Sequence, residues 1–115
     1  MPQRLGQSPH RKYRNQPVTV DGYKFASKAE ARRYGELRLL EFAGHIINLE
    51  LQPKFVFEFQ GVRIGSYKAD FRYLLPHSPT PIVEDVKSPA SKTQAYELRK
   101  KMMKAFHGIE IREVT

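Results

Sequence analysis

The chain has 115 residues, no cysteine and a formal net charge of +8, with 20 Lys and Arg residues against 12 Asp and Glu residues. This length is enough for one domain with a modest hydrophobic core. The lack of cysteine excludes disulfide scaffolds and thiolate metal sites, and no apolar run is long enough to span a membrane. With no secretory signal at its start, the sequence predicts a cytoplasmic protein.

The basic residues are distributed unevenly along the chain, and one group of them lies at the N-terminus. Residues 1–17 contain basic side chains, including Arg11, Lys12 and Arg14, but no acidic one. Because prolines and a glycine interrupt this segment, we expect a flexible basic arm that follows a nucleic-acid backbone. An ordinary disordered terminus fits the pattern equally well. We expect residues 18–115 to form a single domain.

The next segment predicts a hairpin followed by a helix. Asp21-Gly22 suits a type I′ turn, and β-forming residues flank it over residues 18–25. Ser27 and Glu30 then match a capping box, so we expect a helix from there to about residue 43, with Gly44 as its end. Glu30 therefore has a complete structural explanation as a capping residue.

Three strands are predicted in the middle of the chain. Alternating aromatic residues indicate a strand over residues 55–59, and a turn at Gln60-Gly61 leads to a second strand over about 62–74. A third strand is predicted over 82–87, after a proline-rich loop. Side-chain alternation places Lys68, Asp70 and Arg72 together on one face of the second strand.

A second helix is predicted from about Ser91 to His107, ended by Gly108 and followed by a strand over 109–114. The apolar stripe expected on this helix consists of Ala95, Leu98, Met102 and Ala105 or Phe106. Lys100 and Lys101 lie outside this stripe, and they either bind phosphates or form a solvated face of the helix. The order of elements predicts a mixed α/β class.

Charged residues on the third predicted strand suggest chemistry. Asp85 and Lys87 share a face of a strand that is expected to be buried, where charge is unfavourable unless it is paired. A simple salt bridge between them is the structural alternative. Asp70, on the neighbouring strand, can face Asp85, and two converging carboxylates repel unless a proton or a cation lies between them. Such oxygen ligands suit Mg²⁺, which also binds phosphate oxygens.

Taken together, these residues resemble the motif of the PD-(D/E)XK nuclease superfamily. The resemblance is greatest to a family of short phage and prophage endonuclease-like proteins of the DUF1064 type. It covers about residues 18–114. The matching segments are FASKAEARRY (25–34), LQP (51–53), YKADF (67–71), VEDVK (83–87) and TQAY (93–96).

The resemblance implies a restriction-endonuclease-like core, with a central mixed sheet of about four strands flanked by helices in the order α-β-β-β-α-β. It implies that Asp70, Asp85 and the main-chain carbonyl of Val86 bind Mg²⁺ or Mn²⁺. Lys87 would then position or activate water, and Glu30 would support the site or a second metal. Gln52 would contact the site or DNA, with a loop hydrogen bond as the alternative, and Lys68 would contact DNA.

The expected function is therefore a metal-dependent DNA endonuclease, encoded by a phage or prophage and active in branched-DNA resolution or nicking. Resolvases of this fold usually act as homodimers, so a homodimer is a further expectation. A catalytically silent nuclease fold that binds DNA or a protein is the alternative. Clustered charge at Asp70, Asp85 and Lys87 argues against that alternative, because a simple binding module gains nothing from it.

Overall fold

The computed structural model describes residues 16–115, so Arg11, Lys12 and Arg14 of the predicted arm lie outside the described residues. The chain divides into two compact units between Gly35 and Glu36, and each is described by itself. None of the helices formed by residues 16–115 has the length and apolar composition that a membrane span requires.

The first unit contains the predicted hairpin and the start of the first helix. Strands β1 (Val18–Val20) and β2 (Tyr23–Phe25) pair antiparallel. Asp21 and Gly22 connect them with φ angles of 54° and 81°, which are the positive values of a type I′ turn. The tight-turn prediction is therefore confirmed.

Helix α2 (Lys28–Phe42) begins with the predicted capping box. The Glu30 amide donates a 3.1 Å hydrogen bond to Ser27 Oγ, and Glu30 Oε1 accepts a 3.3 Å bond from the Ala26 amide. The helix ends before Gly44, whose φ of 83° lies in the left-handed region. The structure thus confirms the capping role of Glu30.

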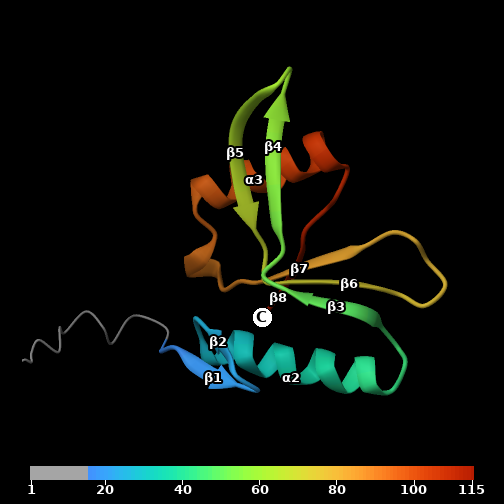
Figure 1. Ribbon diagram of the computed structural model, residues 1–115. Coiled ribbons are helices and arrows are strands. Elements are labelled where there is room, and N and C mark those ends of the chain that lie inside the picture. The colour runs from blue at the N-terminus through green and yellow to red at the C-terminus, as the bar shows by residue number, and fades with distance from the viewer. Residues whose placement is uncertain (1–15) are drawn as a thin grey trace, which may run out of the picture. The chain divides into compact units, whose positions relative to one another are not determined.

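The second unit is built on a four-stranded mixed sheet. Its order is β3 (Ile47–Leu51), β6 (Phe71–Leu74), β7 (Ile82–Val86) and β8 (Arg112–Val114) (Figure 1). The pairs β3–β6 and β6–β7 are antiparallel, and β7–β8 is parallel. The predicted mixed α/β class with a mixed sheet of four strands is therefore confirmed.

Two predictions about the strands were wrong. The predicted strand over 62–74 is two strands, because β5 (Val62–Lys68) forms a separate hairpin with β4 (Lys54–Phe59), whereas β6 joins the main sheet. Strand β3 was not predicted, and it lies where we expected no strand. Between the two helices the chain therefore has five strands rather than three.

The break between β5 and β6 falls at Ala69 and Asp70, where the main chain changes partners. The Ala69 amide donates to the Pro53 carbonyl at 3.0 Å, and the Asp70 amide donates to the Glu84 carbonyl at 3.1 Å. The alternation of burial nevertheless continues across the break, since Tyr67, Ala69 and Phe71 are all buried. Tyr67 and Ala69 pack in the cluster that contains Val83, whereas Phe71 lies opposite Glu84, which points to the other face of β7. The sequence pattern therefore predicted which residues are buried, but not the change of sheet.

Helix α3 (Gln94–Met102) begins slightly later than predicted, after a short 3₁₀ turn at Pro89–Ser91. Thr93 is the N-cap, because its Oγ1 accepts a 3.1 Å hydrogen bond from the Tyr96 amide. The helix continues as a π-helical turn, Met103–His107, and Gly108 ends it with a φ of 68°. The predicted stop at Gly108 is confirmed.

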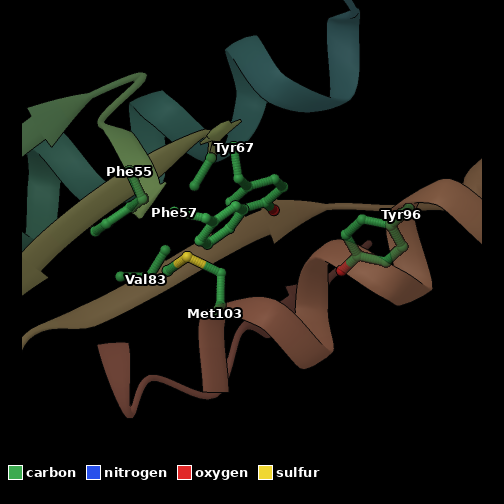
Figure 2. Packing of buried hydrophobic residues seen from close by; sticks show 7 residues of the cluster. Phe55, Phe57, Tyr67, Val83, Tyr96 and Met103 are labelled. Atoms are coloured by element: carbon green, nitrogen blue, oxygen red, sulfur yellow. The ribbon is translucent and has the colours of Figure 1, made fainter. Parts of the chain in front are cut away.

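The hydrophobic core of the second unit joins the β4–β5 hairpin to α3 and β7 (Figure 2). Its members are Phe55, Phe57, Tyr67, Ala69, Val83, Tyr96 and Met103. The predicted apolar stripe of α3 is confirmed only in part, because Met102 and Phe106 pack against this core, whereas Ala95 is exposed and Leu98 is 57% exposed. The stripe did not include Tyr96 and Met103, which are seven residues apart and buried. These two lie on one helical face because seven residues make about two turns.

Candidate functional site

The carboxylates of Asp70 and Asp85 come together where β6 begins beside β7. The Asp70 amide donates a 3.1 Å hydrogen bond to Asp85 Oδ1. In the reverse direction, the amide of Val86 donates a 2.7 Å bond to Asp70 Oδ2. Each carboxylate is thus hydrogen-bonded to the other segment, so the predicted neighbourhood of the two acids is present in the structure.

The main chain of Asp70 is fixed on its other side by Gln52. Gln52 lies between β3 and β4 with a φ of 51°, and its amide donates a 2.9 Å hydrogen bond to the Asp70 carbonyl. This bond is made by the main chain, so it does not test the loop hydrogen bond that we considered as an alternative for the Gln52 side chain. The contact of its side chain with DNA stays a prediction.

Both acids are at least partly shielded from solvent, and burial has the largest effect on the pKa of Asp70. Asp85 is only 3% exposed. Burial raises the pKa of Asp70, and this effect exceeds the opposing contributions of the Val86 amide and the Lys87 and Lys68 charges. Holding the charged form of Asp70 in the folded protein is therefore unfavourable without a further positive partner.

Glu84 lies directly before Asp85 but belongs to a different environment. Consecutive strand residues point to opposite faces, so Glu84 points away from Asp85. Its side chain is buried and accepts a hydrogen bond from the Tyr73 hydroxyl. The geometry therefore agrees with Asp85 as the acid that accompanies Lys87.

The side chain of Lys87 lies against an aromatic ring that sequence reasoning did not assign to the site. Its Nζ is 4.3 Å from the centroid of the Tyr96 ring, which is the geometry of a cation–π interaction. The Lys87 amide donates a 2.8 Å hydrogen bond to the Val114 carbonyl of β8. The available signal was an aromatic residue near the start of a predicted helix, which contributed only to the family resemblance.

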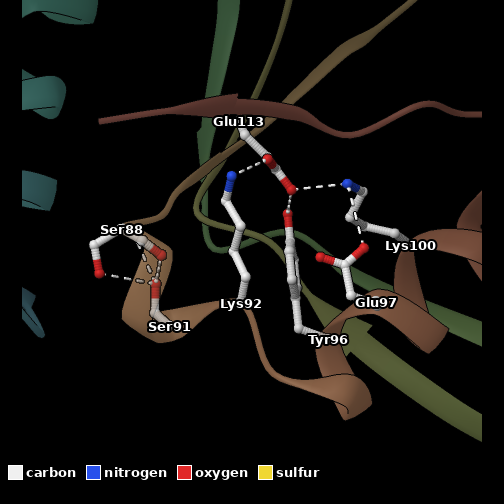
Figure 3. A network of polar contacts seen from close by, with 7 residues as sticks. All are labelled: Ser88, Ser91, Lys92, Tyr96, Glu97, Lys100 and Glu113. Carbon is white, nitrogen blue, oxygen red and sulfur yellow. Dashed lines mark hydrogen bonds and ion pairs between the residues drawn. The ribbon is translucent and has the colours of Figure 1, made fainter.

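Tyr96 is in turn part of a network centred on Glu113 of β8 (Figure 3). The Tyr96 hydroxyl donates a 2.8 Å hydrogen bond to Glu113 Oε2. Lys100 Nζ lies 2.8 Å from the same oxygen, and Lys92 Nζ lies 3.0 Å from Oε1. The network therefore joins α3 and the segment before it to the edge of the sheet.

The charges in this network perturb one another. The hydrogen bonds from Lys100, Lys92 and Tyr96 lower the pKa of Glu113 to about 2. Burial and the bond to Glu113 raise the pKa of Tyr96, and the bond to Glu113 raises that of Lys100. Lys100 is thus paired within the protein, whereas its neighbour Lys101 is exposed. The contacts of both lysines with DNA stay predictions.

Glu113→Gln should lower the free energy of unfolding by about 1 kcal/mol at neutral pH. Because the folded-state pKa of Glu113 is depressed, its stabilisation is present above pH of about 4.5 and is lost as the pH falls through about 2. Urea unfolding of both proteins between pH 7 and pH 2 measures this. Glu97→Gln is the control, since it removes only a 3.6 Å contact to Lys100. A difference that grows towards pH 2 would contradict the prediction.

A pair of lysines lies beside Asp70 on the neighbouring hairpin. Lys54 of β4 and Lys68 of β5 are directly opposite each other in the register, and both are exposed. Like charges directly opposite in a sheet are destabilising. A bound polyanion would offset this repulsion next to the acid pair.

The oxygen atoms of Asp70 and Asp85 suit a magnesium ion that keeps several waters better than they suit a metal ion coordinated only by protein ligands. Over residues 16–115 the structure shows no group of three or more His, Asp or Glu side chains able to hold a metal ion. Two carboxylates are nevertheless what Mg²⁺ commonly uses, because it keeps several waters and takes phosphate oxygens. Asp70 and Asp85 supply that pair, and the Val86 carbonyl stays the predicted third ligand. The predicted role of Glu30 at the pair also stays a prediction.

No curated protein and no solved structure matches the chain. One family, described as "Protein of unknown function (DUF1064)", matches residues 10–114. The match covers most of the chain, including the segments that contain Asp70, Asp85 and Lys87. The chain therefore belongs to the DUF1064 family.

Proposed function

We propose that this protein is a metal-dependent DNA endonuclease of the PD-(D/E)XK type, with Asp70, Asp85 and Lys87 at its active site. The observation that carries the proposal is the convergence of two buried or half-buried carboxylates, joined by the 3.1 Å and 2.7 Å hydrogen bonds between their segments. Clustering like charges in this way is unfavourable for stability, and a site for a divalent cation explains it.

Three further features support a nucleic-acid substrate. The chain has a net charge of +8. The Lys54–Lys68 pair lies on the hairpin beside Asp70 and offers positive charge to a phosphate. Lys87 places another ammonium group directly after β7, the strand that contains Asp85. These charges suit a phosphodiester better than a neutral substrate.

In the proposed reaction, a water molecule gives up a proton to solvent as its oxygen attacks phosphorus. The bond from phosphorus to the leaving oxygen breaks, and that oxygen takes a proton from solvent water. Asp70, Asp85 and the Val86 carbonyl would hold Mg²⁺, with Mn²⁺ as a substitute. When bound, the ion stabilises the charge that develops on the phosphate and lowers the pKa of a coordinated water. Lys87 orients the water and adds positive charge near the attacked phosphate.

The test uses supercoiled plasmid and four-way junction DNA, each with Mg²⁺, with Mn²⁺ and with EDTA. The wild type should cut at least one substrate with metal and neither with EDTA. Asp85→Asn and Lys87→Ala should each reduce cutting by about 100-fold or more, because each removes charge stabilisation at the reacting phosphate. Glu110→Gln, a carboxylate-to-amide change at an exposed residue, should retain activity.

Gel-shift measurements in EDTA separate catalysis from binding. If the wild type binds DNA tightly and cuts neither substrate with either metal, the nuclease proposal is wrong, and a silent binding module is favoured. If Asp85→Asn cuts as fast as the wild type, the site has been placed incorrectly.

A further inference from the structure

The Lys87 side chain could adopt many rotamers, yet its ammonium group lies over one ring. The 4.3 Å distance from Nζ to the Tyr96 centroid lies well within the range of a cation–π contact. Tyr96 itself is buried and fixed at three points. Its amide bonds to Thr93 Oγ1, its hydroxyl bonds to Glu113 Oε2, and its ring belongs to the hydrophobic core.

Because the Tyr96 ring is fixed in the core, its contact with the Lys87 ammonium group restricts the conformations of the long lysine side chain. Lys87 directly follows β7, and Tyr96 belongs to the first turn of α3. The Lys92 and Lys100 ammonium groups are both occupied by Glu113, at 3.0 Å and 2.8 Å. The ring of Tyr96 is therefore left to Lys87 at the shorter distance, since Lys100 Nζ lies 5.7 Å from its centroid.

We propose that Tyr96 is a positioning residue that holds the Lys87 ammonium group beside the Asp70–Asp85 pair through the face of its ring. The catalytic part of this inference rests on the proposed nuclease function, whereas the contact itself does not. A group misplaced by about 1 Å loses about 100-fold in rate, so fixing a long side chain has a large effect on chemistry. The Tyr96 hydroxyl has the separate task of bonding Glu113.

A purely structural role for Tyr96 makes a different prediction. If Tyr96 only attached α3 to β8, the hydroxyl bond to Glu113 would be its important contact. Tyr96→Phe and Glu113→Gln would then be as harmful as Tyr96→Leu. Positioning through the ring predicts instead that Tyr96→Phe retains function and that Tyr96→Leu loses it.

The first measurement requires no nuclease activity. In full-length protein with ¹³C-labelled lysine, the Hε signals of Lys87 are assigned from the Lys87→Arg variant. The ring current of Tyr96 should shift these signals upfield of the other lysines. The shift should persist in Tyr96→Phe and disappear in Tyr96→Leu. If the wild type shows no such shift, the positioning contact is absent and the inference is wrong, whatever the enzyme does.

The second measurement is DNA cleavage with Mg²⁺. Tyr96→Leu should lower kcat by about 10-fold or more and leave KM nearly unchanged, because the lysine is displaced while the DNA surface is intact. Tyr96→Phe should lie within about 3-fold of the wild type. Equal loss in both variants would overturn the inference. Absence of cutting in the wild type would count against the proposed function, and the lysine spectrum would then decide the positioning contact alone.

Discussion

Asp70→Asn is expected to reduce the rate of metal-dependent DNA cleavage by about 100-fold or more. The same substitution should not lower the free energy of unfolding. The amide oxygen can still accept the hydrogen bond that the Val86 amide donates to Asp70 Oδ2 at 2.7 Å. Only the negative charge is lost. Because burial raises the pKa of Asp70, this charge is unfavourable in the folded protein, and its removal should stabilise the protein by up to about 1 kcal/mol.

The stability difference between the wild type and Asp70→Asn should depend on pH. Since the folded-state pKa of Asp70 lies above its unfolded value of about 3.9, the folded state binds the proton more tightly. The wild type should therefore lose stability relative to Asp70→Asn as the pH rises above about 4. Urea unfolding in EDTA at several pH values between 4 and 7 measures the difference. The free energy of unfolding of Asp70→Asn minus that of the wild type should increase from pH 4 to pH 7. A decrease in this difference would contradict the electrostatic argument.

Phe57→Ala is expected to lower the free energy of unfolding by about 3–5 kcal/mol, which is the range for removing a large aromatic side chain from a packed core. Phe57 is 1% exposed, and its ring lies 5.6 Å from that of Phe106 and 5.8 Å from that of His107. The side chain therefore joins the β4–β5 hairpin to the end of the second helix. A domain of this size has only about 5–15 kcal/mol of stability, so the loss is a large fraction of the total.

Val56→Ala is the matched control, because Val56 is the neighbouring residue on the opposite face of β4 and is 37% exposed. It should lower the free energy of unfolding by less than about 1 kcal/mol. Urea titrations followed by circular dichroism compare the two variants. Similar losses in both would mean that the hairpin does not pack on the second helix through the Phe57 face.

Local features were predictable from the sequence because their causes are local. The turn at Asp21-Gly22 and the cap formed by Ser27 and Glu30 each depend on a few adjacent residues, and both are present. The break at Asp70 was not predictable in the same way. Strand pairing depends on distant partners such as Pro53 and Glu84, and the alternation of burial runs through the break unchanged.

The missed elements have different explanations. Strand β3 (Ile47–Leu51) does alternate apolar and polar residues, so its sequence contained a strand signal that we overlooked. In the structure this strand is only partly buried, and Asn48 within it has a positive φ of 57°. In the candidate site, Asp70, Asp85 and Lys87 were identified from their motif. Tyr96 was not, because its contacts depend on Glu113, which the parallel pairing of β7 with β8 places opposite Asp85. That pairing leaves no signature near Tyr96 in the sequence.

The reciprocal hydrogen bonds of the acid pair also affect how much conformational entropy a ligand would have to remove. Asp85 Oδ1 is bound by the Asp70 amide, and Asp70 Oδ2 is bound by the Val86 amide, so both rotamers are set by the strands themselves. Ordering a flexible side chain at a binding site opposes binding by about 0.5–1.5 kcal/mol. Here that ordering occurs when the protein folds. A cation that binds between the two carboxylates would therefore meet side chains that are already immobile, and its affinity would not be reduced by fixing them.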